Sequence, residues 1–277
     1  MVRVRIHAGW RPLHFLVTND DGIDSPGLRA AVQAVEHLGD ILIVAPKIQQ
    51  SGAARSFPMK EGAAEQVTWP VNGPHRITAY RSDGSPAQAV RRAVLLFAPR
   101  KPALAVSGIN YGENLGAGIT ISGTVGAALE AASFGIPSLA VSLQTYLSQH
   151  LSNSHEVNFS AARFFTRQFA EIVLHQPLPP DVDILKIEVP QNATEETPWR
   201  ITRVSRFQYF HSIVKEENGK RLIEGYEPRI EETLLEPDSD VKALAIDQVV
   251  SVSPLSIDLT SAVDRQYLRM VLEKPAE

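Results

Sequence analysis

Short apolar runs of strand length recur along the chain and constrain its fold more than any other feature. They occupy residues 13–18, 41–45, 103–107, 138–143 and 184–189. Continuous apolar runs of this length are typical of strands that are buried on both faces of a parallel sheet. Helical spacing of apolar residues fills the intervals at about 28–38, 87–98, 124–134 and 158–174. We therefore predict an α/β fold with a doubly wound, mostly parallel sheet.

Two segments depart from this alternation. Residues 65–82 carry two short β-prone runs around a Pro/Asn/Gly turn, which predicts a β-hairpin insertion that covers or borders the ligand-binding edge. Residues 199–237 are rich in Thr, Val, Ile and Tyr and strongly charged, which predicts a protruding β arm in need of a partner surface. A hairpin packed on the chain's own core is the alternative.

The remaining segment predicts a strand at 249–253 and an amphipathic helix at 261–273. We expect residues 1–277 to form a single domain, with a core at about 13–198, the arm at about 199–237 and the C-terminal strand and helix at about 238–277.

The composition excludes several classes of protein. The 27 Lys and Arg residues against 31 Asp and Glu residues give a net charge of −4, so the chain has no general attraction for polymeric nucleic acid. The absence of cysteine excludes disulfides, thiolate zinc sites and a cysteine nucleophile. The sequence contains neither a run of apolar residues that would span a membrane nor an apolar signal segment, so we expect a cytoplasmic protein without a membrane partner.

Two adjacent carboxylates, Asp20 and Asp21, follow the first apolar run in the segment TNDDGIDSPG. Two unit charges about 4 Å apart repel by roughly 4 kcal/mol at an effective dielectric constant of 20, so such a pair shares a proton or binds a cation. Oxygen ligands favour magnesium, manganese or calcium over zinc. The alternative is a plain Asp-Gly turn, with Asp24 or Ser25 capping the next helix and the carboxylates in solvent.

A long glycine-rich loop, residues 107–125, follows the run at 103–107 and ends at the start of a predicted helix. Its last residues, Ser122, Gly123 and Thr124, would offer two hydroxyls and the free N–H groups of a helix N-terminus to an anion such as phosphate. In the alternative, Ser122 or Thr124 only caps the helix. A third segment, residues 44–56, brings Ser51 to the same edge of the sheet.

Common phosphate motifs are absent. The sequence has neither a GxxxxGK[ST] loop nor a dinucleotide-binding fingerprint, which disfavours an NAD(P)-dependent dehydrogenase. Asn19 stands where a DxD phosphatase would carry its nucleophilic aspartate, and an amide cannot attack phosphorus. This favours hydrolysis by a water molecule that a metal activates.

These segments together resemble the SurE family of stationary-phase survival proteins. TNDDGIDSPG, VAP followed by SG, VSGINYGENLG and SGTVGAALEA occur in the family's order, with a later match at 253–260. The resemblance implies a Rossmann-like, SurE-like α/β fold with C-terminal elements exchanged between protomers, and hence a homodimer or tetramer. It also implies a metal-dependent 5'(3')-nucleotidase that hydrolyses nucleoside monophosphates, with short polyphosphate as a further substrate class.

The resemblance assigns roles to individual residues. It implies one divalent cation per subunit, Mg²⁺ or Mn²⁺, held by Asp20, Asp21, Ser51 and Asn110, with Asp20 and Asp21 as the catalytic residues. It implies a phosphate pocket lined by Asn19, Gly108, Asn114, Ser122, Gly123 and Thr124.

Several positions depart from the family pattern. Gln88 and Ala89 stand where members commonly have Asp and Cys, Ile121 occupies a common Tyr position, and residues 47–50 replace a more polar run. These departures concern nucleoside preference and leave all four implied metal ligands in place. The competing hypothesis is a non-catalytic nucleotide-binding or sensing module on the same fold.

Overall fold

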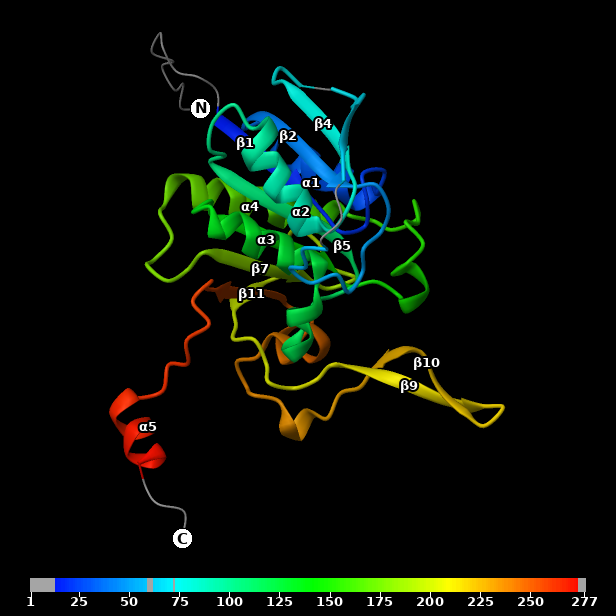
Figure 1. The fold of residues 1–277 in the computed structure, drawn as a ribbon, viewed down its shortest axis with the longest axis vertical. Helices are drawn as coiled ribbons and strands as arrows, with labels where there is room; N and C mark the ends of the chain where they lie inside the picture. Colours follow the sequence, from blue (N-terminus) through cyan, green and yellow to red (C-terminus); the bar gives the residue numbers. More distant parts are fainter. Residues whose placement is uncertain (1–12, 59–61, 72, 274–277) are drawn as a thin grey trace.

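A nine-stranded sheet lies at the centre of the described part of the chain, residues 13–58, 62–71 and 73–273 of a computed structural model (Figure 1). The strand order is β3-β4-β2-β1-β5-β6-β7-β11-β8. The strands are β1 (Leu13–Thr18), β2 (Gly39–Pro46), β3 (Ala64–Val67), β4 (Ile77–Ser82), β5 (Leu104–Tyr111), β6 (Ser138–Leu143), β7 (Ile184–Val189), β8 (Trp199–Ile201) and β11 (Val250–Leu255).

The six strands from β4 to β7 in this order pair in parallel, and five of them, all except β4, are the strands that the apolar runs predict. Strand β3 pairs antiparallel with β4 at one edge, and β11 pairs antiparallel with β7 near the other. The predicted α/β fold with a mostly parallel sheet is therefore confirmed.

Helices cover both faces of the sheet: α1 (Pro26–Val35) and α4 (Ser160–His175) on one face, α2 (Pro86–Arg92) and α3 (Gly123–Ser133) on the other. Successive residues of β1 point to opposite faces, so Phe15 and Val17 pack in the core under α1 and α4. Leu16 packs in the core under α2 and α3. Burial on both sides explains why the strand sequences are mostly apolar.

The start of α1 follows the expected capping pattern. The Ser25 hydroxyl accepts a hydrogen bond from the N–H of Gly27 at 3.2 Å, and Pro26 occupies the first helical position. The helix expected at 87–98 is shorter, because its α-helical part ends at Arg92 and a π-helical turn, Ala93–Phe97, follows.

The hairpin predicted at 65–82 is present as β3 and β4. Because β4 also pairs in parallel with β2, the hairpin widens the sheet instead of forming a separate insertion over its edge. The sequence could not show this, since the partner of β4 lies more than thirty residues earlier in the chain.

The C-terminal third differs from the prediction in one respect. The segment expected to begin the arm at 199 first adds β8 to the main sheet, beside β11. The projecting part is the two-stranded hairpin of β9 (Phe210–Glu217) and β10 (Lys220–Pro228), which we call the arm. Its turn residues Asn218 and Gly219 have φ of 52° and 73°, as a tight hairpin turn requires.

The C-terminal helix α5 (Arg265–Leu272) has no buried residue, and it projects from the sheet in a different direction from the arm (Figure 1). The other short helical segments are Gly116–Ile121, Leu147–Gln149, Glu232–Leu234 and Lys242–Ile246. Among the described helices, none combines the length and apolar character needed to cross a bilayer.

Candidate active site

The Asp20 and Asp21 pair lies directly beyond the carboxyl end of β1. Both side chains are buried, with exposed fractions of 4% and 2% for the two residues. Gly22 follows with a φ of 101°, a conformation that lets the chain turn toward α1. The alternative in which these carboxylates are solvated beside a plain turn is therefore wrong, even though Ser25 does cap the helix.

The N-terminus of α3 packs against Asp20. The Thr124 hydroxyl donates a hydrogen bond to Asp20 Oδ1 at 2.6 Å. A Cβ atom on Gly123 would lie 2.7 Å from Cβ and Oδ2 of Asp20, so only glycine allows this approach. The backbone N–H of Gln50 donates to the Asp20 carbonyl oxygen at 2.7 Å, which ties the loop after β2 to the same point.

Asp21 is held by two donors from other loops. Gln49 Nε2 donates to Asp21 Oδ1 at 2.9 Å, and the backbone N–H of Tyr111 donates to Oδ2 at 3.3 Å. Gln49 also donates to the backbone oxygen of His150 at 2.7 Å. Gln49 was not among the predicted site residues, because a glutamine in a loop carries no signal of its long-range partner.

The electrostatics of the pair fit a divalent cation. Burial raises the pKa of Asp20, and burial together with the neighbouring Asp20 carboxylate holds the pKa of Asp21 well above its ordinary value. No cationic side chain of the described residues contributes to either shift. A buried carboxylate pair without a cation of its own is costly, and a hard metal ion would relieve that cost.

Neutral oxygens would have to complete such a metal site. In the described ranges, no three His, Cys, Asp or Glu side chains gather as a metal-binding group. Asn110 directly precedes Tyr111, and its Nδ2 donates to the Gly112 carbonyl oxygen at 2.7 Å, which leaves Oδ1 as its free acceptor. Ser51 is exposed and directly follows Gln50. The structure thus brings the four predicted ligands to one edge of the sheet.

The residues predicted to bind phosphate lie at the same edge, with two qualifications. Ser122 Oγ accepts a hydrogen bond from the N–H of Val125 at 3.1 Å, so Ser122 caps α3. The Thr124 hydroxyl donates its hydrogen bond to Asp20. The Thr124 hydroxyl thus positions Asp20, and the assignment of Thr124 to the phosphate pocket stays a prediction.

Two more predicted phosphate residues have structural contacts of their own. Gly108 has a φ of 133°, and a Cβ there would lie 2.3 Å from the Val141 carbonyl oxygen, so the position requires glycine. Asn19 Nδ2 donates to the Gly22 carbonyl oxygen at 3.0 Å, while its buried Oδ1 has no hydrogen-bond partner among the described residues.

Asn114 is fixed from three sides. Its N–H donates to Glu188 Oε2 at 2.9 Å, its carbonyl oxygen accepts from Lys186 Nζ at 2.9 Å, and its Nδ2 donates to Ser142 Oγ at 2.9 Å. The loop expected to contact phosphate is therefore tied to strands β6 and β7.

Lys186, Glu188 and Asp240 form a group that we call the buried triad. Lys186 Nζ lies 3.0 Å from Asp240 Oδ2 and 3.4 Å from Glu188 Oε1, and all three side chains are shielded from solvent. Burial opposes the charge of Lys186, yet Glu188 and Asp240 raise its pKa, while burial raises the pKa of Glu188 to about 7. The signal in the sequence is Lys and Glu at alternate positions within the apolar run at 184–189.

The buried triad also reaches the base of the arm. Asp240 accepts hydrogen bonds from the N–H of Gly116 at 3.1 Å and from the N–H of Ser205 at 2.9 Å. One carboxylate therefore joins the loop after β5 to the segment that leads into β9.

Several known proteins are similar to this chain in sequence and fold. A sequence profile of the family described as Survival protein SurE matches residues 15–211. The chain is 39% identical to 5'-nucleotidase SurE of Thermococcus gammatolerans, over 94% of this chain and 96% of that protein. It is 40% identical to 5'-nucleotidase SurE of Methanothrix thermoacetophila, over 93% and 98%. The crystal structure of the SurE protein from Aquifex aeolicus superposes with a TM-score of 0.74 at 29% identity, over 94% of this chain and 100% of that one.

Proposed function

The chain belongs to the SurE family, and from this premise we propose that it is a metal-dependent phosphomonoesterase that hydrolyses nucleoside 5'-monophosphates, and 3'-monophosphates, to nucleoside and phosphate. One observation carries the proposal: Asp20 and Asp21 are adjacent, buried, without a cation of their own, and packed against the N-terminus of α3. Relatives that share more than a third of their residues with this chain are named 5'-nucleotidases, which supports the substrate class.

Asp20, Asp21, Ser51 and Asn110 would hold one Mg²⁺ or Mn²⁺ ion. All four offer oxygen, which these cations prefer to nitrogen and sulfur. Bound there, the cation would supply Lewis acidity and offset the negative charge of the phosphoryl group.

Side chains and backbone groups of the site would carry out the proton transfer, position the carboxylates and stabilise the phosphoryl oxygens. A carboxylate oxygen of Asp20 or Asp21 would accept a proton from the attacking water and orient it. Thr124 and Gln49 fix the two carboxylates, because each donates a hydrogen bond to one of their oxygens. Because Ser122 Oγ accepts from the N–H of Val125, the main-chain donor left to stabilise the phosphoryl oxygens would be the N–H of Gly123 at the start of α3. Water is consumed, and the leaving oxygen departs as the hydroxyl of the nucleoside.

The experiment is an assay of phosphate release. Purified protein would be given a panel of nucleoside 5'- and 3'-monophosphates, short polyphosphate and an aryl phosphate, each with Mg²⁺, Mn²⁺ or EDTA. We expect release from nucleoside monophosphates with either metal and none with EDTA. Undiminished release in EDTA would contradict the metal site, and nucleotide binding without turnover in any metal would favour a sensing module.

The assembly is a further part of the proposal. The arm carries exposed Ile213, Val214, Leu222 and Ile223, and α5 has no buried residue. Apolar side chains on projecting elements are typical of surfaces that a second subunit covers. We place this chain in the cytoplasm as a homodimer or tetramer, with residues 1–277 as one SurE-like unit.

A further inference from the structure

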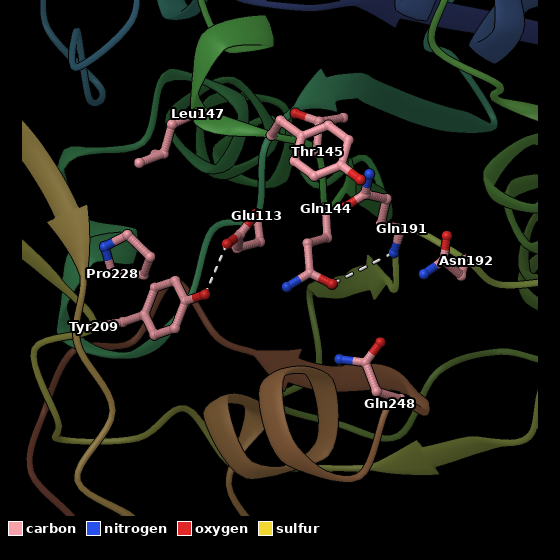
Figure 2. A pocket seen from close by; sticks show the side chains of 10 residues that line it. Glu113, Gln144, Thr145, Leu147, Gln191, Asn192, Tyr209, Pro228 and Gln248 are labelled. Carbon is pink, nitrogen blue, oxygen red and sulfur yellow. Dashed lines mark hydrogen bonds between the residues drawn. The ribbon is translucent and has the colours of Figure 1, made fainter.

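A second recess lies beside the carboxylate site, at the carboxyl ends of β5, β6 and β7 (Figure 2). It is a cavity of about 450 Å³. Its walls come from the segments that follow the three strands and from the base of the arm, with Glu113, Gln144, Thr145, Gln191 and Tyr209 among the lining residues.

The recess and the carboxylate site share one loop. Glu113 lines the recess, and the next residue, Asn114, belongs to the predicted phosphate pocket. Asn114 is hydrogen-bonded to Ser142, two residues before Gln144 in the recess. In the sheet, β6 and β7 lie two and three strands from β1, which is about 10 to 14 Å at the usual strand spacing. An extended nucleotide whose phosphate lay at Asp20 would span such a distance.

The inner wall of the recess has unused hydrogen-bonding capacity. Glu113 and Thr145 are 6% and 8% exposed, and among the described residues Glu113 Oε2 and Thr145 Oγ1 have no hydrogen bond of good geometry, although the Gln144 amide and the Thr145 N–H lie near the Glu113 carboxylate. Tyr209 donates to the other carboxylate oxygen, Glu113 Oε1, at 2.8 Å (Figure 2). Buried polar atoms without partners are rare in folded proteins, so their presence in a recess indicates a place for a polar ligand.

The outer wall suits a flat, polar, aromatic group. Tyr146 lines the recess and is 65% exposed, although a tyrosine ring gains free energy when a partner covers it. Amide side chains stand around it, from Gln144, Gln191 and Asn192. An amide offers a donor and an acceptor together, which matches the edge of a nucleobase, and an aromatic ring offers its face for stacking.

We infer that this recess is the nucleoside subsite of the proposed nucleotidase, with Tyr146 stacking on the base and Glu113 and Thr145 hydrogen-bonding the ribose. The inference rests on the proposed function and adds to it the residues that select a nucleoside. None of the three positions that depart from the family pattern, 88, 89 and 121, lines the recess.

The test compares two substrates that differ only in the base. Adenosine 5'-monophosphate and ribose 5-phosphate would be assayed with wild type and with Tyr146→Ala. We expect kcat/KM for the nucleotide to fall about 5-fold or more, as loss of one base–aromatic stacking contact predicts, and kcat/KM for ribose 5-phosphate to stay unchanged. An equal loss on both substrates, or no loss on either, would overturn the inference.

A matched control and a second readout guard against a folding defect. Gln33→Ala removes an exposed amide on α1, away from the recess, and should leave both substrates unaffected. Free adenosine should inhibit ribose 5-phosphate hydrolysis competitively in wild type, and much more weakly in Tyr146→Ala.

Calorimetry separates failure of this inference from failure of the proposed function. If wild type hydrolyses neither substrate, the proposed function fails, but titration with adenosine alone still tests the recess. Binding to wild type that weakens in Tyr146→Ala supports the subsite. The absence of adenosine binding to wild type would overturn it.

Discussion

At the scale of single residues, the Asp20 and Asp21 pair is the feature on which the proposed chemistry depends. Both carboxylates are buried, and each is held by a hydrogen-bond donor from another part of the chain. The fixed geometry keeps the two negative charges close in the absence of a metal, where burial and their mutual repulsion destabilise the fold. If the site binds a cation as proposed, the metal-free protein would be less stable than the metal-bound form.

Asp20→Asn tests this reasoning directly. The amide keeps the shape of the side chain but removes one charge, so turnover should fall by more than about 100-fold through loss of the metal. Because repulsion with Asp21 is relieved, the metal-free variant should melt at the same temperature as wild type or higher. Phosphate release and thermal melting in EDTA are the measurements. Full turnover by the variant would rule out the assigned role of Asp20.

A second prediction at this scale concerns His14, which is buried in β1. Burial, with a contribution from Arg100, lowers the pKa of His14, so the folded protein keeps the ring neutral while the unfolded chain protonates near pH 6.5. The stabilisation is complete above about pH 6.5 and is lost as the pH falls below it. His14→Val should thus reduce the drop in melting temperature between pH 7 and pH 5. A drop as large as that of wild type would show that His14 does not contribute to acid sensitivity.

At the scale of elements, the sequence predicts what local patterning controls. The strands at 138–143 and 184–189 fall where the apolar runs predict them, because burial on both faces makes most of their positions apolar. The cap at Ser25 was equally visible, since Ser-Pro before an apolar period is a local signal. Long-range pairing was not visible: nothing local shows that β4 joins β2 or that β8 joins β11.

The residues of the candidate site also divide into those with a local signal in the sequence and those whose partners are distant along the chain. Asp20 and Asp21 were found because two carboxylates at a strand end are conspicuous in any sequence. Gln49 and the buried triad were missed because their importance lies in partners far along the chain. The sequence pointed to Thr124 as a residue of the phosphate pocket, whereas in the structure its hydroxyl donates a hydrogen bond to Asp20.

One contact between elements is open to test. A Cβ on Gly126 in α3 would lie 2.3 Å from the Ala54 carbonyl oxygen, in the loop that carries Ser51, and the Arg55 side chain fixes that loop to Glu130 of α3 at 2.9 Å. Gly126→Ala should push the loop away from α3, lower kcat/KM about 10-fold and cost about 1–3 kcal/mol of unfolding free energy, since overpacking outweighs the better helix propensity.

The matched control is Gly225→Ala in the arm, where no atom lies within 4 Å of the new Cβ. Both variants would be compared by urea unfolding and by steady-state kinetics. If Gly126→Ala matched Gly225→Ala in both measurements, the packing of the loop on α3 would not matter for the site.

At the scale of the whole molecule, the outer part of the arm and α5 are described elements that expose large apolar side chains. Val214 and Ile223 of the arm are 63% and 73% exposed, although both are large and apolar. A two-stranded ribbon is at best marginally stable alone, so a second subunit that covers it would stabilise it.

Replacing both residues, Val214→Glu with Ile223→Glu, should convert the proposed dimer or tetramer into a smaller species, as measured by analytical ultracentrifugation. Lys220→Glu is the control, because it changes the charge of the arm by the same −2 and removes no apolar surface. We expect it to leave the assembly intact. A wild-type chain that sediments as a monomer at micromolar concentration would contradict the assembly proposal.

The buried triad has a consequence for how the molecule unfolds. Lys186 cannot leave its two carboxylate partners without stranding charge in a dry interior, at a cost of several kcal/mol per unpaired ion. Because the same three side chains anchor the backbone of Asn114 and, through Asp240, that of Ser205, these two stretches should exchange their amide protons as one cooperative unit. Local unfolding that begins at the base of the arm would therefore also disrupt the loop that carries Asn114, and hydrolysis would be lost before the central sheet unfolds.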